Sequence, residues 1–394
     1  MNIAPSLMYK GRLEHTLTGE MCDSFLLWAV EKGASDIVFR TDDPPWIQID
    51  GVWHEGAHFF LSTAECEMLT NYFSGQSHKA GNVQAGKSAD FAYSIATDQR
   101  GRKQRFRVNV TASNAGHYIV MRALPTQLPR MEDLGLEKEI SNNIYPPNGM
   151  IIVSGVMGSG KSTLLAGVIH SAILKREYGG AGIGRQILTL EHPIEFDFAS
   201  IPHERRTAPL AQSEIELHVR SWAEGVRSMT RRKGEIVMVG EARDRETLES
   251  MISTVEQGVT AYATVHAQDV PQTLTRIVNT FPEEEQPNIA SILKANLRMI
   301  IHQRLVPRLR SSDSNGKKLP GRIALREFLV FSEDLRMILY KTPYHALIPR
   351  IRKMVEENGQ PLVVDAWNKY KEKLISDETY QSIRHEQETT RGKQ

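Results

Sequence analysis

The segment that most constrains this chain is GVMGSGKST, from Gly155 to Thr163, which fits the pattern GxxxxGK[ST]. An apolar run at residues 150–154 precedes it and predicts a buried strand. A helical pattern at residues 161–175 follows it. A strand that passes through a glycine-rich turn directly into a helix favours an α/β fold with parallel strands.

The residues of this turn are suited to binding phosphate. Gly158 and Gly160 let the backbone turn so that several N–H groups point inward, and the helix N-terminus adds partial positive charge. In such a loop Lys161 reaches the β- and γ-phosphates of ATP, and the Ser162 hydroxyl ligates Mg²⁺. We therefore predict a site for ATP and Mg²⁺ formed by Gly155, Gly158, Ser159, Gly160, Lys161, Ser162 and Thr163.

The length of 394 residues exceeds what one hydrophobic core usually supports, so we expect two domains. Residues 1–124 have mixed α/β patterns, including a hairpin signal at Asp50-Gly51. Residues 125–148 carry four prolines and are predicted to be an interdomain linker. Residues 149–394 then form the predicted ATPase domain, with a helical C-terminal part.

Strands and helices alternate after the glycine-rich loop, which predicts parallel βαβ units. The predicted strands lie at residues 186–190, 236–239, 261–265 and 323–331. The predicted helices lie at residues 214–229, 245–256, 273–279 and 287–302.

Two acidic residues follow predicted strands of this sheet. Glu191 comes directly after residues 186–190, and Glu241 follows residues 236–239 and a glycine. Ligands of an open parallel sheet bind beyond the carboxyl ends of its strands. Hydrolysis needs one carboxylate to orient the attacking water and another to hold the water shell of the metal. Either glutamate alone fits a surface or salt-bridged residue better, but their positions at strand ends after a phosphate-binding loop lead us to predict Glu241 and Glu191 for these roles.

A histidine and two arginines complete the predicted catalytic set. His266 follows the strand at residues 261–265, where it could sense the γ-phosphate. Arg107 and Arg122 lie on predicted strands of the first domain and could project towards a phosphate from another domain or subunit. A solvated strand face explains both arginines as well as a catalytic role does.

The composition narrows the function classes. A net charge of +1 gives no global attraction to nucleic acid, so we expect no direct, specific nucleic-acid binding. The N-terminus lacks an apolar signal segment, and no run approaches the roughly 18 apolar residues of a membrane span. The two cysteines, Cys22 and Cys66, form no metal-binding pattern and are expected to be reduced. These features favour a cytoplasmic protein.

Together, the motifs resemble those of the secretion and pilus ATPases, in particular the pilus retraction, type II secretion, and type IV secretion and conjugation ATPases. The motifs are the glycine-rich loop, LEHPIE after it, then VGEARD and TVHAQD, with RFRVN upstream. The resemblance implies an N-terminal PAS-like domain, a RecA-like P-loop ATPase domain and a hexamer. It also implies peripheral association with an inner-membrane machine, and it assigns Glu191, Glu241, His266, Arg107 and Arg122 to the catalytic site.

Departures from the family pattern suggest the subtype. His192 and Val259 replace the usual aspartate and histidine, and residues 346–351 only loosely match the C-terminal signature of retraction ATPases. The absence of four cysteines speaks against the zinc-bearing assembly branch. The chain resembles most the ATPases of conjugative and Dot/Icm-like type IVB secretion systems. A pilus retraction motor, a nucleic-acid helicase and a nucleotide-regulated scaffold are the alternatives.

Overall fold

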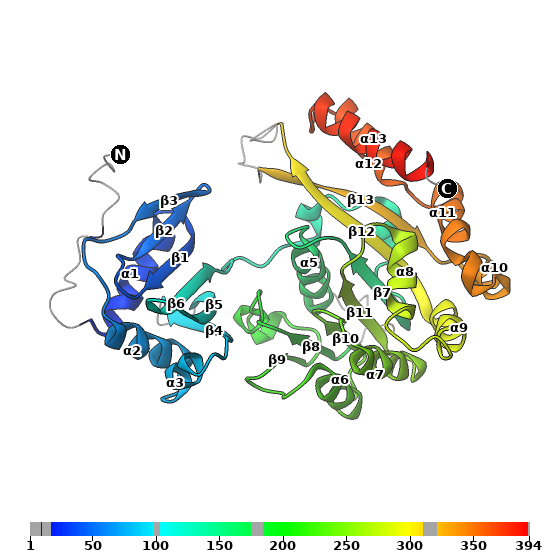
Figure 1. The fold of residues 1–394 in the computed structure, drawn as a ribbon. Helices are drawn as coiled ribbons and strands as arrows, with labels where there is room; N and C mark the ends of the chain where they lie inside the picture. The colour runs from blue at the N-terminus through cyan, green and yellow to red at the C-terminus, as the bar shows by residue number, and fades with distance from the viewer. Residues whose placement is uncertain (1–8, 10–16, 98–102, 175–183, 310–320, 393–394) are drawn as a thin grey trace. The chain divides into compact units, whose positions relative to one another are not determined.

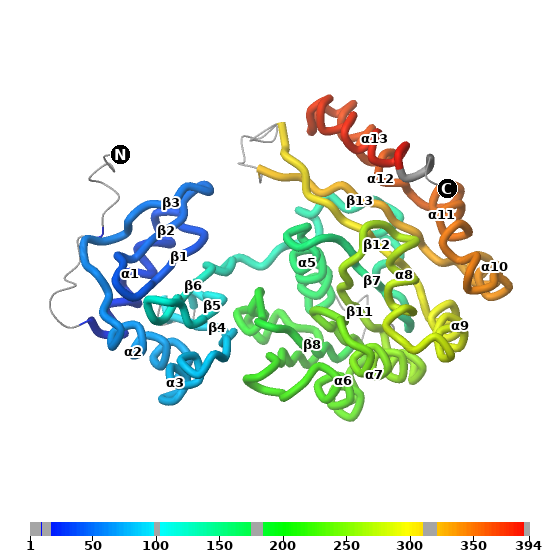
Figure 2. Tube along the Cα trace, in the orientation of Figure 1, coloured from blue at the N-terminus to red at the C-terminus, as the bar shows by residue number. Residues whose placement is uncertain are grey.

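The computed structural model describes Tyr9 and residues 17–97, 103–174, 184–309 and 321–392 of the chain. It divides into two compact units. The first consists of Met1–Leu128 and His192–Ile201, and the second of Pro129–Glu191 and Pro202–Gln394. Figures 1 and 2 trace the chain through both units. Each unit has its own sheet and its own hydrophobic core.

The first unit contains a six-stranded antiparallel sheet, in the order β3-β2-β1-β6-β5-β4. The bounds are β1 Ala34–Arg40, β2 Trp46–Ile49, β3 Val52–Glu55, β4 Ala89–Ala96, β5 Lys103–Ser113 and β6 Gly116–Ala123. The predicted hairpin at Asp50-Gly51 is confirmed, since β2 and β3 pair around it. Both turn residues have positive φ, 50° and 81°, as a tight two-residue hairpin requires.

Three helices pack on this sheet: α1 Gly19–Glu31, α2 Thr63–Ser74 and α3 Lys79–Gln84. Ser62 caps α2 through a reciprocal pair of hydrogen bonds with Glu65, which satisfies backbone N–H groups that a helix start leaves unpaired. Buried Phe25, Phe39 and Phe106 are among the large side chains of the core between the helices and the sheet. The unit is therefore an α+β domain with the helices gathered on its core face.

The second unit contains a seven-stranded sheet in the order β13-β12-β7-β11-β10-β8-β9. Its strands are β7 Gly149–Ser154, β8 Ile187–Glu191, β9 Leu210–Glu214, β10 Ile236–Val239, β11 Thr260–Val265, β12 Leu297–Pro307 and β13 Arg322–Val330. All neighbours pair in parallel except β12 and β13. The predicted mostly parallel, RecA-like sheet is thus confirmed.

Helices connect and cover these strands (Figure 1). The longer ones are α5 Lys161–Leu174, α6 Trp222–Arg231, α7 Arg245–Glu256, α8 Val270–Val278, α9 Gln286–Asn296, α10 Glu333–Lys341, α11 Leu347–Asn358, α12 Leu362–Lys371 and α13 Asp377–Gly392. The short ones are η2 Met131–Leu134, α4 Lys138–Asn143, η5 His203–Arg205 and η6 Tyr344–Ala346, whereas η4 Phe198–Ser200 belongs to the first unit.

The two faces of the β7 strand meet different helices. Met150 and Ile152 join a large core with residues of α6 to α11. Helix α5 also contacts β7 but contributes no residue to that core, so it covers the opposite face of the strand. The parallel strands β7, β10 and β11 have their carboxyl ends at the same edge of the sheet.

Two predicted helices of this unit were wrong in part. The helix predicted at residues 287–302 ends at Asn296, and Leu297–Pro307 is instead strand β12. The helix predicted at residues 214–229 begins only at Trp222, because Glu214 ends strand β9. The burial pattern of β12 explains the first error. This strand lies between β7 and β13, and most of its residues are buried on both faces, so no alternation marks it as a strand.

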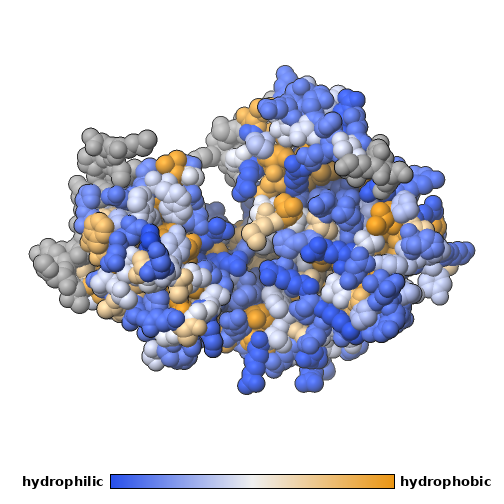
Figure 3. All heavy atoms as spheres, in the orientation of Figure 1, coloured by the Kyte–Doolittle hydropathy of each residue, from blue (hydrophilic) through white to orange (hydrophobic). Residues whose placement is uncertain are grey.

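The visible surface of each unit is mainly hydrophilic, with scattered apolar patches (Figure 3). Among the helices of the described residues, none has the length and hydrophobicity needed to cross a bilayer.

Candidate active site

The loop between β7 and α5 can be built only with glycine at critical positions. Gly155, Gly158 and Gly160 have φ values of 148°, 74° and 83°. A Cβ atom at Gly155 would lie 2.3 Å from the carbonyl oxygen of Gln303, and one at Gly160 would lie 2.9 Å from Gln303 Nε2. The loop therefore needs glycine both for its backbone conformation and for its close approach to β12.

Lys161, the first residue of α5, is buried and turned back over this loop. Its Nζ donates to the carbonyl oxygens of Gly155 and Val156 at 2.8 and 2.9 Å. An ammonium group is thereby held against the strand-to-helix turn, where the N–H groups of a helix N-terminus also point. The loop and Lys161 form a site of positive potential that suits an anion.

The hydroxyl groups of the loop fall into two kinds. Ser159 is buried, and among the described residues its Oγ has no hydrogen-bond partner. Ser162 and Thr163 are exposed in the first turn of α5. An exposed hydroxyl beside Lys161 is the kind of group that completes the coordination of Mg²⁺ brought by a polyphosphate. Among the described residues, no cluster of three or more His, Cys, Asp or Glu side chains could hold a metal without such help.

Glu241 and His266 meet at the carboxyl ends of two neighbouring strands. Because β10 and β11 pair in parallel, the residues just beyond them lie side by side. Glu241 Oε1 lies 3.2 Å from His266 Nε2, and the same carboxylate forms an ion pair with Arg243. The structure thus brings together two predicted catalytic residues that are 25 positions apart in sequence.

The electrostatics of His266 place it near Lys161. Burial lowers the pKa of His266, and the positive charge of Lys161 lowers it further, while Glu241 acts in the opposite direction. The imidazole is therefore neutral at pH 7. One of its nitrogens then donates a hydrogen bond and the other accepts one, and the tautomer decides which does which.

A cavity of about 1070 Å³ unites these groups. Val156 and Met157 from the loop, Glu241 and Arg243 after β10, and His266 after β11 line it. This volume accommodates a nucleotide-sized ligand. The glycine-rich loop, an acid and a neutral histidine therefore border one common space within the second unit.

Glu191 ends β8, the strand next to β10, but its surroundings differ from those of Glu241. It is 7% exposed, and its Oε1 accepts hydrogen bonds from Thr189 Oγ1 at 2.7 Å and from Gln212 Nε2 at 3.1 Å. It is not among the described residues that line the cavity. The structure thus holds the Glu191 carboxylate firmly, and its catalytic role stays a prediction.

Arg107 and Arg122 lie in the first unit as direct cross-strand partners on β5 and β6. Arg122 Nε donates to Asp36 Oδ1 at 2.8 Å, and the Arg122 side chain is largely exposed. Adjacent positions on one sheet put the two guanidinium groups on the same face. Their contribution to a phosphate site stays a prediction.

Two residues of the site were not predicted from the sequence. Arg243 was noticed only as part of a motif, although a basic residue two positions after Glu241 could have suggested its ion pair. Gln303 gave no signal, because residues 287–302 directly before it were predicted to be a helix and strand β12 was not predicted. In the structure Gln303 Nε2 donates to the carbonyl oxygen of Ser159 at 2.7 Å and lies directly beside the loop.

Comparison with known proteins connects this geometry to characterised molecules. A family model described as "Type II/IV secretion system protein" matches residues 89–373. The type IV pilus retraction ATPase PilT of Pseudomonas aeruginosa is 27% identical over 323 residues, which cover 80% of this chain and 83% of PilT.

Two solved structures share the fold over nearly the whole chain. The ATPase DotB of Legionella pneumophila is 31% identical, with a TM-score of 0.84, covering 96% of this chain and 98% of DotB. The pilus retraction motor PilT with bound ADP is 26% identical, with a TM-score of 0.75, covering 94% and 97% of the two chains.

Proposed function

Because this chain belongs to the family of type II/IV secretion system proteins, we propose that it is the motor of a type IVB-like secretion or conjugative DNA-transfer system. The chain is an ATPase, as its family and its similarity to PilT and DotB establish. ATP hydrolysis is coupled to motion between its two units. The observation that carries the proposal is the cavity shared by the glycine-rich loop, Glu241 and His266.

Each residue of this cavity has a proposed role. Lys161 and the backbone N–H groups of the loop bind the β- and γ-phosphates. Glu241 orients and deprotonates the attacking water, because its carboxylate borders the cavity and can accept a proton. His266, neutral and 3.2 Å from Glu241, contacts the γ-phosphate and registers its loss.

Mg²⁺ would be held by Ser162 and by the phosphates, and it would neutralise developing charge on the transferred group. The exposure of Ser162 at the start of α5 supports this assignment. Glu191 is proposed to support the water shell of the metal, and Thr163 with the loop glycines completes the binding site.

Arg107 and Arg122 are proposed to approach the γ-phosphate, from the same chain or from a neighbouring subunit of a hexamer. A hexameric ring would hold several such sites around its circumference. Motion between the two units of each subunit could then act on an inner-membrane machine. Cytoplasmic localisation with attachment through partners follows from this proposal. Native mass measurement with and without ATP tests the hexamer, and a monomer under both conditions would contradict it.

The enzymatic core of the proposal is tested with the purified full chain. We expect Mg²⁺-dependent hydrolysis of ATP that does not change on addition of DNA. Lys161→Ala should abolish turnover, because the variant loses the charge that holds the phosphates. Strong stimulation by single-stranded DNA would favour the helicase alternative, and ATP binding without any hydrolysis would favour the scaffold.

A pilus retraction motor is the second candidate, and the similarity to PilT supports it. We place the secretion system first because the motifs resemble those of Dot/Icm-like ATPases and because the DotB structure has a higher identity and TM-score than the PilT structure. Deletion of the gene separates the two proposals. Loss of protein secretion or conjugative transfer with normal pilus retraction supports the first, and the reverse phenotype supports the second.

A further inference from the structure

Gln303 is a buried residue of β12 that holds the glycine-rich loop in place. Its side chain is almost inaccessible, and its Nε2 donates to the carbonyl oxygen of Ser159 at 2.7 Å. Gly155 and Gly160, at either end of the loop, pack against the same residue. A buried carbonyl that loses its donor is costly, so this contact restrains the loop conformation.

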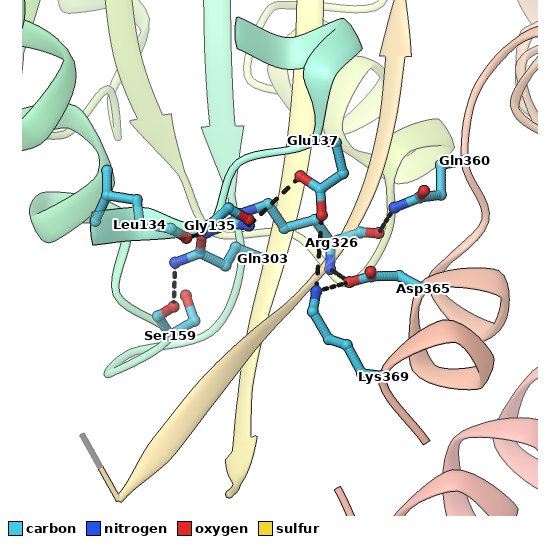
Figure 4. A network of polar contacts seen from close by, with 9 residues as sticks. All are labelled: Leu134, Gly135, Glu137, Ser159, Gln303, Arg326, Gln360, Asp365 and Lys369. Carbon is cyan, nitrogen blue, oxygen red and sulfur yellow. Dashed lines mark hydrogen bonds and ion pairs between the residues drawn. The ribbon is translucent and has the colours of Figure 1, made fainter. Parts of the chain in front are cut away.

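Arg326 determines how the amide of Gln303 is oriented. The two residues are directly opposite on β12 and β13, and Arg326 Nε donates to Gln303 Oε1 at 3.0 Å. Since an arginine only donates, the amide oxygen must face Arg326 and the amide NH₂ must face Ser159 (Figure 4). The hydrogen bond to the loop thus depends on Arg326.

The same guanidinium binds the segment by which the chain enters the second unit. Arg326 Nη2 donates to the carbonyl oxygen of Leu134 at 2.8 Å, and Nη1 donates to that of Gly135 at 2.9 Å. The carboxylate of Glu137 lies 3.4 Å from Nη1 and balances its charge. All three guanidinium nitrogens therefore have partners, and the residue is only 2% exposed.

A third branch of the network reaches α12 (Figure 4). The backbone N–H of Arg326 donates to Asp365 Oδ2 at 2.8 Å. Lys369 forms an ion pair with Asp365 and lies 3.7 Å from Glu137. The segment 134–137, the strand β13 and the helix α12 are thus joined by charged contacts that water reaches poorly.

We propose that Gln303 and Arg326 are positioning residues that couple the state of the glycine-rich loop to residues 134–137 and to α12. The inference rests on the proposed ATP site and extends it to residues that touch no substrate. When nucleotide binding moves the carbonyl group of Ser159, the side-chain amide of Gln303 must move with it. Otherwise the Ser159 carbonyl oxygen loses its hydrogen bond from Gln303. Because Arg326 donates both to that amide and to the carbonyl oxygens of Leu134 and Gly135, the displacement reaches residues 134–137.

Gln303→Glu isolates the contact with the loop. The carboxylate still accepts from Arg326 but has no N–H for Ser159. We expect the dissociation constant of a fluorescent ATP analogue to rise about tenfold, in line with the loss of one buried hydrogen bond. Arg326→Lys keeps the positive charge but lacks the planar fork that spans Gln303 and both carbonyls, so it should weaken binding as well.

Arg304→Gln is the matched control. It lies next to Gln303 on β12, and like Gln303→Glu it changes the charge by −1, but its side chain pairs with Glu386 outside the network. Its dissociation constant should stay within about twofold of wild type, because exposed ion pairs contribute little. Thermal melting of each variant without nucleotide establishes that it is folded.

Hydrogen exchange distinguishes coupling from a merely structural role. In the wild type, saturating ATP analogue should change the protection of amides 130–137 and 362–371. In Gln303→Glu, saturated with the same analogue, this nucleotide-dependent change should be lost. An unchanged response, or a dissociation constant within twofold of wild type, overturns the inference. A wild-type protein that binds no ATP analogue overturns the proposed function instead.

Discussion

Glu241 Oε1 lies 3.2 Å from His266 Nε2, beyond the ends of two adjacent parallel strands. The pairing joins the acid that is proposed to activate water to a histidine whose pKa is lowered by burial and by Lys161. A change in protonation or position of one group is therefore transmitted to the other without intervening residues.

Glu241→Gln should retain ATP binding and lose about 10³-fold in turnover. The amide matches the shape of the carboxylate but cannot accept a proton from water, and positioned general bases contribute roughly 10²- to 10⁴-fold. Binding of labelled ATP and single-turnover release of phosphate check the two halves of this prediction.

Glu249→Gln provides the control for Glu241→Gln. Glu249 lies on α7 and forms an exposed ion pair with Arg245, so its loss should leave turnover within about twofold of wild type. Turnover near wild-type rate in Glu241→Gln would remove Glu241 from the proposed mechanism.

Because of His266, ATP turnover should persist into mildly acidic solution. Its pKa is below the ordinary value of about 6.5, so the imidazole stays neutral as the pH falls through 6.5 and becomes charged only at lower pH. The acid limb of the turnover profile should therefore lie below pH 6.5.

His266→Gln tests whether this residue causes the acid limb. The amide can hydrogen-bond but does not titrate, so the part of the limb that His266 produces should disappear while turnover falls by about tenfold. Turnover measured from pH 5 to 8 in both proteins checks this. Identical profile shapes would assign the limb to another group.

Gly155→Ala should disable the loop because of steric overlap as well as backbone strain. The added Cβ would lie 2.3 Å from the carbonyl oxygen of Gln303, at a φ of 148°. We expect at least tenfold weaker ATP binding and a destabilisation of about 2 kcal/mol or more. Calorimetry of ATP-analogue binding and urea unfolding measure both effects.

Gly258→Ala is a control that separates the effect of backbone strain from the effect of steric overlap with Gln303. Gly258 also has a positive φ, 87°, but a Cβ there meets no described atom within 4 Å. This variant should lose only about 1 kcal/mol of stability and keep wild-type ATP affinity. Equal effects of the two substitutions would contradict the role assigned to the Gln303 contact.

His302 is buried on β12, and its Nδ1 lies 3.4 Å from Ser154 Oγ on the neighbouring strand β7. This histidine should make the protein less stable in acid. Burial is the main cause that lowers its pKa to about 4. Unfolded chains take up this proton near pH 6.5, whereas the folded protein does so only near pH 4. The stabilisation is therefore fully present above pH 6.5 and lost as the pH falls to 4, by about 3 kcal/mol.

His302→Gln should flatten this dependence in urea unfolding between pH 4 and 6.5. Glu327, which faces His302 across the β12–β13 pair, needs to be controlled, because burial raises its pKa to about 7. Its effect has the opposite sign, since stability is lost as the pH rises from 4.5 to 7. The difference in unfolding free energy between wild type and His302→Gln isolates the contribution of the histidine. If this difference did not change between pH 4 and 6.5, the prediction would be contradicted.

Local patterns in the sequence were sufficient to predict the loop and the strand ends. Glycine at positions 155, 158 and 160 indicates a tight turn with positive φ, because other residues rarely adopt that conformation. The structure has positive φ at all three positions. The alternation of short apolar runs with helical patterns predicted parallel strands, and parallel strands bring their carboxyl ends to one edge. That rule correctly placed Glu241 and His266 together.

Only the tertiary structure decided which residues hold that loop. Gln303 is 144 positions from Ser159, and its contact exists because Leu297–Pro307 is a strand beside β7. A strand that is mostly buried on both faces, as this one is, has no clear period of two in its hydrophobicity, so its sequence does not distinguish it from a buried helix. Backbone requirements of single residues and the periodicity of hydrophobic residues can be recognised in the sequence. Contacts across the sheet cannot, because they depend on how all the strands pack.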